Sequence, residues 1–336
     1  MSVIAEQPAY TDPPARARSG LEHQPDRFRL AEERLTELPQ VPAAHANADG
    51  ETEQLGDVTV THRFVDAPGD GESVRWHFVE CGPLQAPTAV FLHGVPDSWW
   101  QWHYALRDIG RTHHCLAIDL KGYGQSDKRT GDYRQEGVAA QLHSLLDAIG
   151  VRTFSLVTHD RGTPVGDHLV ARLGLRVERY GRGQQHLWYL HPDLHPQEAL
   201  FTGPDAQRIL SDARRFVTTA YALLAEYRVA DGDLARTIQE FSHPGIAAAV
   251  PRYFNSSSFR QEWLDRRARL IAQWRCPVLL LQGAHDPLQP REFYTDDSVL
   301  ERLRPGSALH LFDAGHFWPF EAPDEMCGVL REYLTF

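Results

Sequence analysis

The chain reads Phe-Ser-Leu-Val-Thr-His-Asp-Arg-Gly-Thr-Pro-Val-Gly at residues 154–166, where an apolar run turns toward a helix at an aspartate. The run Phe154–Val157 predicts a strand that is buried on both faces, as in a parallel sheet. Thr158 to Gly162 fit the pattern small-x-nucleophile-x-small of a nucleophile elbow, with Asp160 where serine is usual. Gly162 suits a point where strand and helix nearly touch. The alternative is that Asp160 only caps the helix that follows.

The rest of the chain from about residue 57 repeats this strand–helix rhythm. Further apolar runs end in turns, and the spacing of apolar residues in Gln135–Ile149 predicts a helix between two of them. Two alternating segments flank a turn-rich cluster and predict an antiparallel hairpin. We therefore expect an α/β fold with a mostly parallel, doubly wound sheet. The predicted strands are Val58–Val65, Ser73–Cys81, Thr88–Leu92, Cys115–Ile118, Phe154–Val157, Val278–Leu281 and Ala308–Phe312.

The composition along the chain changes three times, which predicts four parts. Residues 1–55 are polar and rich in Pro, Ala and Glu, so we expect a poorly structured N-terminal extension or arm, with a candidate helix at Phe28–Leu38. Residues 56–186 and 273–336 carry the strand signals and form the two parts of the core. The sequence of residues 187–272 favours helices and has few strand signals. An insertion of this size between strands predicts a helical cap, or lid, over the strand ends.

Charge and composition exclude several classes of protein. Lys and Arg number 34 against 45 Asp and Glu, and a net charge of −11 disfavours binding to nucleic acid. The four cysteines show no Cys-x-x-Cys spacing and read as reduced thiols, and the histidines show no firm metal-ligand pattern. The apolar runs are too short to span a bilayer, and no secretion signal is visible. We expect a cytoplasmic protein that acts on a small-molecule substrate without a cofactor or a metal. The protein could also form a homodimer.

Two further strand ends carry polar residues that complete a constellation with Asp160. Asp286 follows Val278–Leu281 in the turn Gly-Ala-His-Asp-Pro, and His316 follows the last predicted strand in Gly-His-Phe-Trp-Pro. The order nucleophile, acid, histidine is that of a hydrolase triad, and strand ends in a parallel sheet converge on one edge. Separately, His316 would read as a loop histidine and Asp286 as a turn former. Val95, after the strand Thr88–Leu92, and Arg161 are the candidate N–H donors of an oxyanion hole.

These motifs together resemble the α/β-hydrolases of the epoxide hydrolase and dehalogenase group, which use an aspartate nucleophile. The resemblance covers about residues 57–336. It implies the α/β-hydrolase fold with a helical cap. It also implies that Asp160 attacks an sp³ carbon to form an ester, which a water activated by His316 and Asp286 then hydrolyses. The motifs are HGVP (93–96), DLKGYGQSDK (119–128), THDRG (158–162), GAHDP (283–287) and GHFWPFEAP (315–323).

The resemblance also implies residues that meet the substrate. Epoxide hydrolases protonate the departing oxygen with cap tyrosines, which Tyr189 and Tyr253 resemble, whereas Tyr221 and Tyr227 read as packing residues. We also assign substrate binding to His93, Pro96 and Trp188.

Three other functions stay open beside epoxide opening. Arg161 after the nucleophile resembles the fluoroacetate dehalogenases, although Pro164 stands where they have a second arginine and His186-Leu187 replaces their His-Trp pair. Lyase or cyclase chemistry in biosynthesis and a binding protein with an inactive site are the others. The sequence contains no Gly-x-Ser-x-Gly, which counts against an esterase or lipase.

Overall fold

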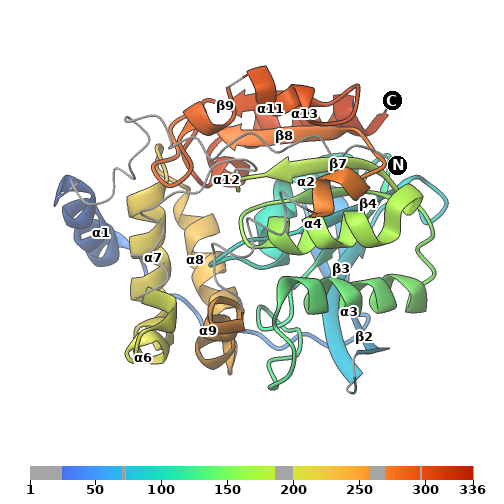
Figure 1. Cartoon of the computed structure of the whole chain (residues 1–336). Coiled ribbons are helices and arrows are strands. Elements are labelled where there is room, and N and C mark those ends of the chain that lie inside the picture. Colours follow the sequence, from blue (N-terminus) through green and yellow to red (C-terminus); the bar gives the residue numbers. More distant parts are fainter. Residues whose placement is uncertain are drawn as a thin grey trace.

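The computed structural model describes residues 25–69, 71, 73–185, 200–256, 269–295 and 297–335. A nine-stranded sheet runs through the described chain in the order β1-β2-β3-β5-β4-β6-β7-β8-β9 (Figure 1). Strands β1 to β3 and the β3–β5 pair are antiparallel, and every pair from β5 to β9 is parallel. The strands are β1 (Thr52–Leu55), β2 (Val58–Pro68), β3 (Ser73–Cys81), β4 (Thr88–Leu92), β5 (His114–Ile118), β6 (Phe154–Thr158), β7 (Val177–Gly183), β8 (Val278–Gly283) and β9 (Ala308–Phe312).

The predicted α/β fold is confirmed, and the reason lies in the central strands. All residues of β6 and β8 are buried, because helices cover both faces of the sheet. The strand β7 was not among the predicted strands. Its sequence contains three charged residues, Glu178, Arg179 and Arg182. Arg182 is buried, and a charged residue in a central strand can be expected only when its buried partner is known.

Helices pack on both faces of the sheet and enclose two apolar clusters. On one face Leu142 and Leu169 pack from α3 (Gln135–Ala148) and α4 (Gly162–Leu173). On the other, Leu106 and Met326 pack from α2 (His103–Ile109) and α13 (Pro323–Thr335). The remaining short elements of the core are α11 (Asp297–Glu301), α12 (Trp318–Glu321) and the 3₁₀ turns Trp99–Trp102, Gly174–Arg176, Ile271–Gln273 and Arg291–Phe293.

Helices between β7 and β8 lie beside the sheet (Figure 1), and we call the four that are bounded within the described residues the inserted helices. They are α6 (Ala206–Ser211), α7 (Ala213–Leu224), α8 (Asp231–Phe241) and α9 (Ile246–Ser256). They fall within the predicted helical insertion, residues 187–272. No helix within the described residues is long and apolar enough to cross a bilayer.

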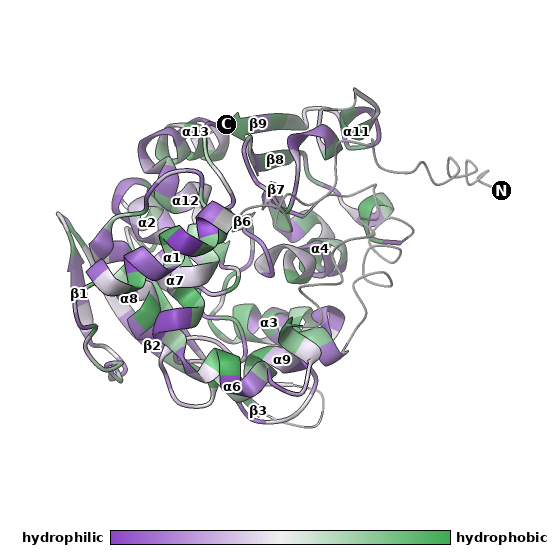
Figure 2. Cartoon of the chain, turned by 90° about the vertical axis from the view of Figure 1, so that its left-hand side faces the viewer, coloured by the Kyte–Doolittle hydropathy of each residue, from purple (hydrophilic) through white to green (hydrophobic). Residues whose placement is uncertain are grey.

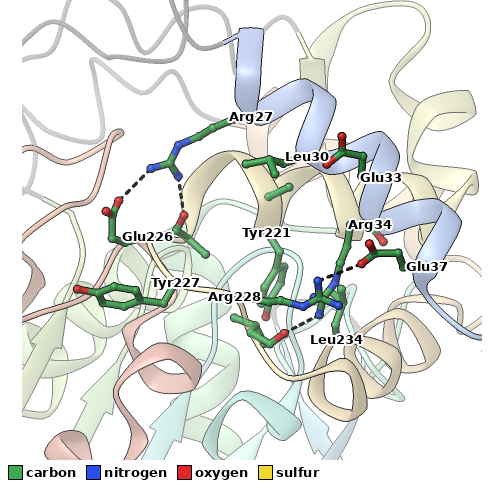
Figure 3. Close-up of a pocket in the computed structure, with 14 residues that line it drawn as sticks. Arg27, Leu30, Glu33, Arg34, Glu37, Tyr221, Glu226, Tyr227, Arg228 and Leu234 are labelled. Atoms are coloured by element: carbon green, nitrogen blue, oxygen red, sulfur yellow. Dashed lines mark hydrogen bonds and ion pairs between the residues drawn. The ribbon is translucent and has the colours of Figure 1, made fainter.

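The N-terminal extension is more ordered than the sequence predicts. The helix α1 (Pro25–Glu37) matches the candidate helix and lies against α7, as Figures 1 and 2 show from two sides. Arg27 donates to the carbonyl oxygen of Ala225 and pairs with Glu226 at 2.9 Å, beside a hollow of about 360 Å³ between α1 and the inserted helices (Figure 3). The edge strand β1 corrects the prediction that the sheet begins after residue 55, because Thr52 to Leu55 pair with β2.

Candidate active site

The turn between β6 and α4 places Asp160 in a conformation that few side chains adopt. Its φ is +45°, in the left-handed region that disfavours residues with a Cβ by about 1–2 kcal/mol. Such an outlier is typical of a functional position that the surrounding fold holds in place. A Cβ at Gly162 would lie 2.6 Å from the carbonyl oxygens of Leu92 and His93, so this position needs glycine. The predicted elbow is therefore present.

The three predicted triad residues come together at the carboxyl ends of β6, β8 and β9. His316 Nδ1 lies 2.9 Å from Asp286 Oδ2, and His316 Nε2 lies 3.7 Å from Asp160 Oδ2. The second oxygen of Asp286 accepts the N–H of Leu288 at 2.8 Å. The side chains of Asp286 and His316 are almost fully buried. The arrangement joins a histidine that an acid orients to a carboxylate at the elbow.

Charge and burial compete at these groups. Burial alone would lower the pKa of the His316 imidazole, but the charge and hydrogen bond of Asp286 and the charge of Asp160 raise it to about 9. Burial raises the pKa of Asp160, but the charge of His316 and the N–H of Val95 more than offset this effect, so the pKa lies below its ordinary value. The two neighbouring acids thus favour the charged form of the His316 imidazole.

The predicted oxyanion donors flank Asp160. The N–H of Val95 donates to Asp160 Oδ1 at 2.9 Å, which leaves Oδ2 on the side of His316. Arg161 is the residue that precedes the first turn of α4, where backbone N–H groups favour negative charge. Its guanidinium lies 4.6 Å from the centre of the Phe254 ring.

A cavity of about 150 Å³ opens onto these groups. Ten of the fifteen described lining residues are apolar, and five of these ten come from the inserted helices α7 and α9. Pro96 lies in this wall, as predicted, and Gln185 contributes a carboxamide that was not predicted. The described lining residues are Val95, Pro96, Asp160, Arg161, Gln185, Leu200, Phe201, Phe216, Ala220, Leu223, Leu224, Phe254, Leu288, Gln289 and His316. Such a wall suits an apolar ligand with one reactive polar centre.

Two of the predicted substrate contacts are corrected. His93 is fully buried outside the wall, with Nδ1 2.8 Å from the carbonyl oxygen of Gly94 and Nε2 accepting the N–H of Leu120 at 3.0 Å, so it joins two loops. Tyr253 in α9 is also fully buried, and its ring packs against Tyr123 and Tyr133.

The wall position that we expected for Tyr253 belongs to its neighbour Phe254. The reason is the helical rotation of about 100° per residue, which separates the directions of the two side chains. The Tyr253 hydroxyl has no hydrogen-bond partner in the described part of the chain, and burial raises its pKa well above the usual value. Tyr189 and Trp188 lie outside the described residues.

A buried network behind the site was missed. Gln101 Nε2 donates to Asp97 Oδ2 and to His159 Nδ1, both at 2.9 Å, and Gln101 Oε1 accepts the N–H of Gly94. His159 Nδ1 is then an acceptor, so its Nε2–H donates to the carbonyl oxygen of His316 at 2.8 Å. Burial lowers the pKa of His159 to about 3, which agrees with a neutral ring.

The same network reaches the inserted helices. Tyr221 of α7 donates from its hydroxyl to Asp97 Oδ1 at 2.6 Å, and its ring stacks on Phe317 next to His316. Burial raises the pKa of Asp97 to about 7. The i, i+4 spacing of Asp97 and Gln101 is the sequence signal that could have indicated their hydrogen bond. Nothing in the sequence identifies their other partners in the network.

Comparison with known proteins identifies the family of the chain. Residues 87–180 match the family model described as alpha/beta hydrolase fold. Epoxide hydrolase 1 of Caenorhabditis elegans is 30% identical over 289 residues, which cover 79% of this chain and 69% of that protein. A haloalkane dehalogenase of Mesorhizobium japonicum is 41% identical over 100 residues, 30% of this chain and 32% of its own.

Other matches are shorter or show the fold alone. Among the first curated relatives, epoxide hydrolase 2 of Caenorhabditis elegans is 30% identical over 106 residues, so the match spans 31% of this chain and only 29% of that relative. The structure of an epoxide hydrolase from Bacillus megaterium superposes with a TM-score of 0.68 at 21% identity. It covers 82% of this chain and all of its own.

Proposed function

Because the chain belongs to the α/β-hydrolase family that includes the epoxide hydrolases, we propose that it hydrolyses an epoxide of a small apolar molecule through an ester of Asp160. One observation carries the proposal. A largely buried aspartate at the elbow lines a mostly apolar cavity, with His316 Nε2 3.7 Å away and Asp286 orienting that histidine. An aspartate nucleophile suits displacement at an sp³ carbon, where it forms an ester that water can cleave.

In the first step, Asp160 Oδ2 attacks an epoxide carbon. The bond from that carbon to the ring oxygen breaks, and the oxygen takes up a proton. The N–H of Val95 holds Oδ1, so Oδ2 is the oxygen that faces His316 and the cavity. The departing oxygen needs a proton donor near neutral pH. Since Tyr253 lies outside the wall, Tyr189 is the remaining predicted tyrosine for this role.

Formation of the ester changes the proton affinity of His316. The charge of Asp160 is one of the causes that raise the pKa of this imidazole, and esterification removes that charge. The imidazolium then releases its proton more readily and becomes a base. The first step therefore prepares the base that the second step requires.

In the second step, His316 takes a proton from a water that attacks Cγ of the ester. The negative charge that develops on the carbonyl oxygen is stabilised by the N–H groups of Val95 and Arg161. The bond from Cγ to the substrate-bearing oxygen then breaks, and His316 returns the proton to the departing diol. Asp160 is regenerated with one oxygen from the water.

A second candidate is the release of halide from a haloacid. The observation that favours it is Arg161, whose side chain lies in the cavity wall next to the nucleophile and could pair with a carboxylate. The ten apolar residues among the fifteen described wall residues favour the epoxide.

A single turnover in heavy-oxygen water tests the proposal. Protein in excess over each of a panel of epoxides and haloacids should yield unlabelled product, with the label in a peptide that contains Asp160. Asp160→Asn serves as the control and should take up no label. Label in the product and none in Asp160 would mean direct attack by water and would refute the ester.

A further inference from the structure

The segment Gly181-Arg-Gly-Gln-Gln185 at the end of β7 has an unusual backbone. Gln184 has a φ of +44° and Gln185 a φ of +86°, although neither is glycine. Such a backbone conformation is strained and persists only where the surrounding structure holds it. Both side chains are buried. The fold therefore maintains a strained turn beside the candidate active site.

A buried ion pair holds this turn. Arg182 Nε and Nη2 donate to the two carboxylate oxygens of Asp167 at 2.8 Å and 2.9 Å, and neither side chain is exposed to solvent. The Tyr180 hydroxyl also donates to Asp167, at 2.8 Å. The third nitrogen of the guanidinium, Nη1, donates to the carbonyl oxygen of Gln185. The position of Gln185 is thus fixed by a bidentate pair in the interior.

The two glutamines face different members of the triad. Trp318 Nε1 donates to Gln184 Oε1 at 2.9 Å, and Gln184 Nε2 donates to Asp286. Gln185 lies in the cavity wall, with Nε2 3.4 Å from Asp160 Oδ2. Gln184 therefore supports the acid that orients the histidine, whereas Gln185 meets the nucleophile itself.

Two side chains meet at this one oxygen of the nucleophile. Asp160 Oδ2 lies 3.7 Å from His316 Nε2 and 3.4 Å from Gln185 Nε2, while Oδ1 is occupied by the N–H of Val95. Both distances are too long for strong direct hydrogen bonds. We propose that the carboxamide of Gln185, together with His316, holds the water that hydrolyses the Asp160 ester. This inference rests on the proposed function.

The donors and acceptors balance in this arrangement. Once Oδ2 carries the substrate carbon, its charge is gone and the amide of Gln185 is released from it. The water gives one proton to His316 Nε2 and directs its other O–H to Gln185 Oε1, so that a lone pair faces Cγ of Asp160. The Cγ–O bond to the substrate breaks as before, and Gln185 neither gains nor loses a proton.

The test separates ester formation from ester hydrolysis. Gln185→Met keeps the length of the side chain but replaces the amide oxygen with a thioether, which is only a weak acceptor for the water. Rapid-quench single turnovers with an epoxide substrate, read by intact mass, give both rates. We expect Gln185→Met to slow hydrolysis by about tenfold or more, so that the ester accumulates, while ester formation stays within about twofold of the wild type. Gln239→Met makes the same chemical change on α8, outside the described cavity wall, and should alter neither rate.

Three results would overturn the proposal. Hydrolysis at the wild-type rate in Gln185→Met would show that the amide does not hold the water. Equal slowing of both steps would indicate a general effect on the turn. If Gln185→Met does not fold, Gln185→Asn replaces it, because asparagine withdraws the amide by one methylene. Ester hydrolysis that is not selectively slowed in Gln185→Asn would then be the third such result. A wild-type protein that forms no ester refutes the proposed function, whatever Gln185 does.

Discussion

The ion pair between His316 and Asp160 should control when the histidine can act as a base. We predict that Asp160→Asn, which mimics the loss of charge on esterification, lowers the proton affinity of His316. At 3.7 Å, Coulomb's law gives about 1 kcal/mol with the dielectric constant of water and about 4 kcal/mol with an effective value of ~20. Since each 1.4 kcal/mol is a factor of ten, the proton affinity should fall between about fivefold and about a thousandfold.

The assay is an NMR titration of labelled histidine, with the His316 signal assigned by its absence in His316→Gln. In the wild type the pKa of His316 is raised to about 9, so its signal should stay that of imidazolium through neutral pH. In Asp160→Asn the midpoint should move toward neutrality. Asp313→Asn is the control, because this exposed carboxylate pairs with His285 and not with His316. Equal midpoints in the wild type and Asp160→Asn would refute the charge coupling.

The raised pKa of His316 also determines how the stability of the folded protein depends on pH. A histidine whose pKa rises on folding stabilises the protein fully below about pH 6.5, and this contribution is lost as the pH rises through about 9.

Four further changes have defined outcomes. His316→Gln should leave ester formation intact and trap protein plus one substrate, seen by intact mass. Arg182→Met should lower the free energy of unfolding by about 3–5 kcal/mol in urea titrations, because it leaves Asp167 buried without its cation. Removal of residues 1–55 should lower the melting temperature, since it deletes β1 and α1; an unchanged value would show that both are dispensable. Tyr253→Phe should form the ester at the wild-type rate in single turnovers, and a hundredfold loss would restore it as the acid.

The sequence was sufficient wherever the signal is local. The apolar runs that became β4, β5, β6 and β8 could be recognised because strands buried on both faces are usually nearly continuous apolar runs. Asp160, Asp286 and His316 could be identified because each follows such a strand directly, and parallel strands end at the same edge of a sheet. The pattern around Gly162 could be recognised as well, because the close approach of helix and strand excludes every residue larger than glycine at this position.

Only the tertiary structure decided the features that depend on partners distant in sequence. The charged strand β7 is buried because Arg182 meets Asp167 from α4, and no period in the sequence records that pairing. The choice of Phe254 over Tyr253 for the cavity wall depends on how α9 is rotated against the sheet. Gln185 reaches Asp160 only through a left-handed turn that a buried guanidinium holds. Local sequence determines which groups stand at the strand ends, whereas long-range packing determines which of them face the cavity.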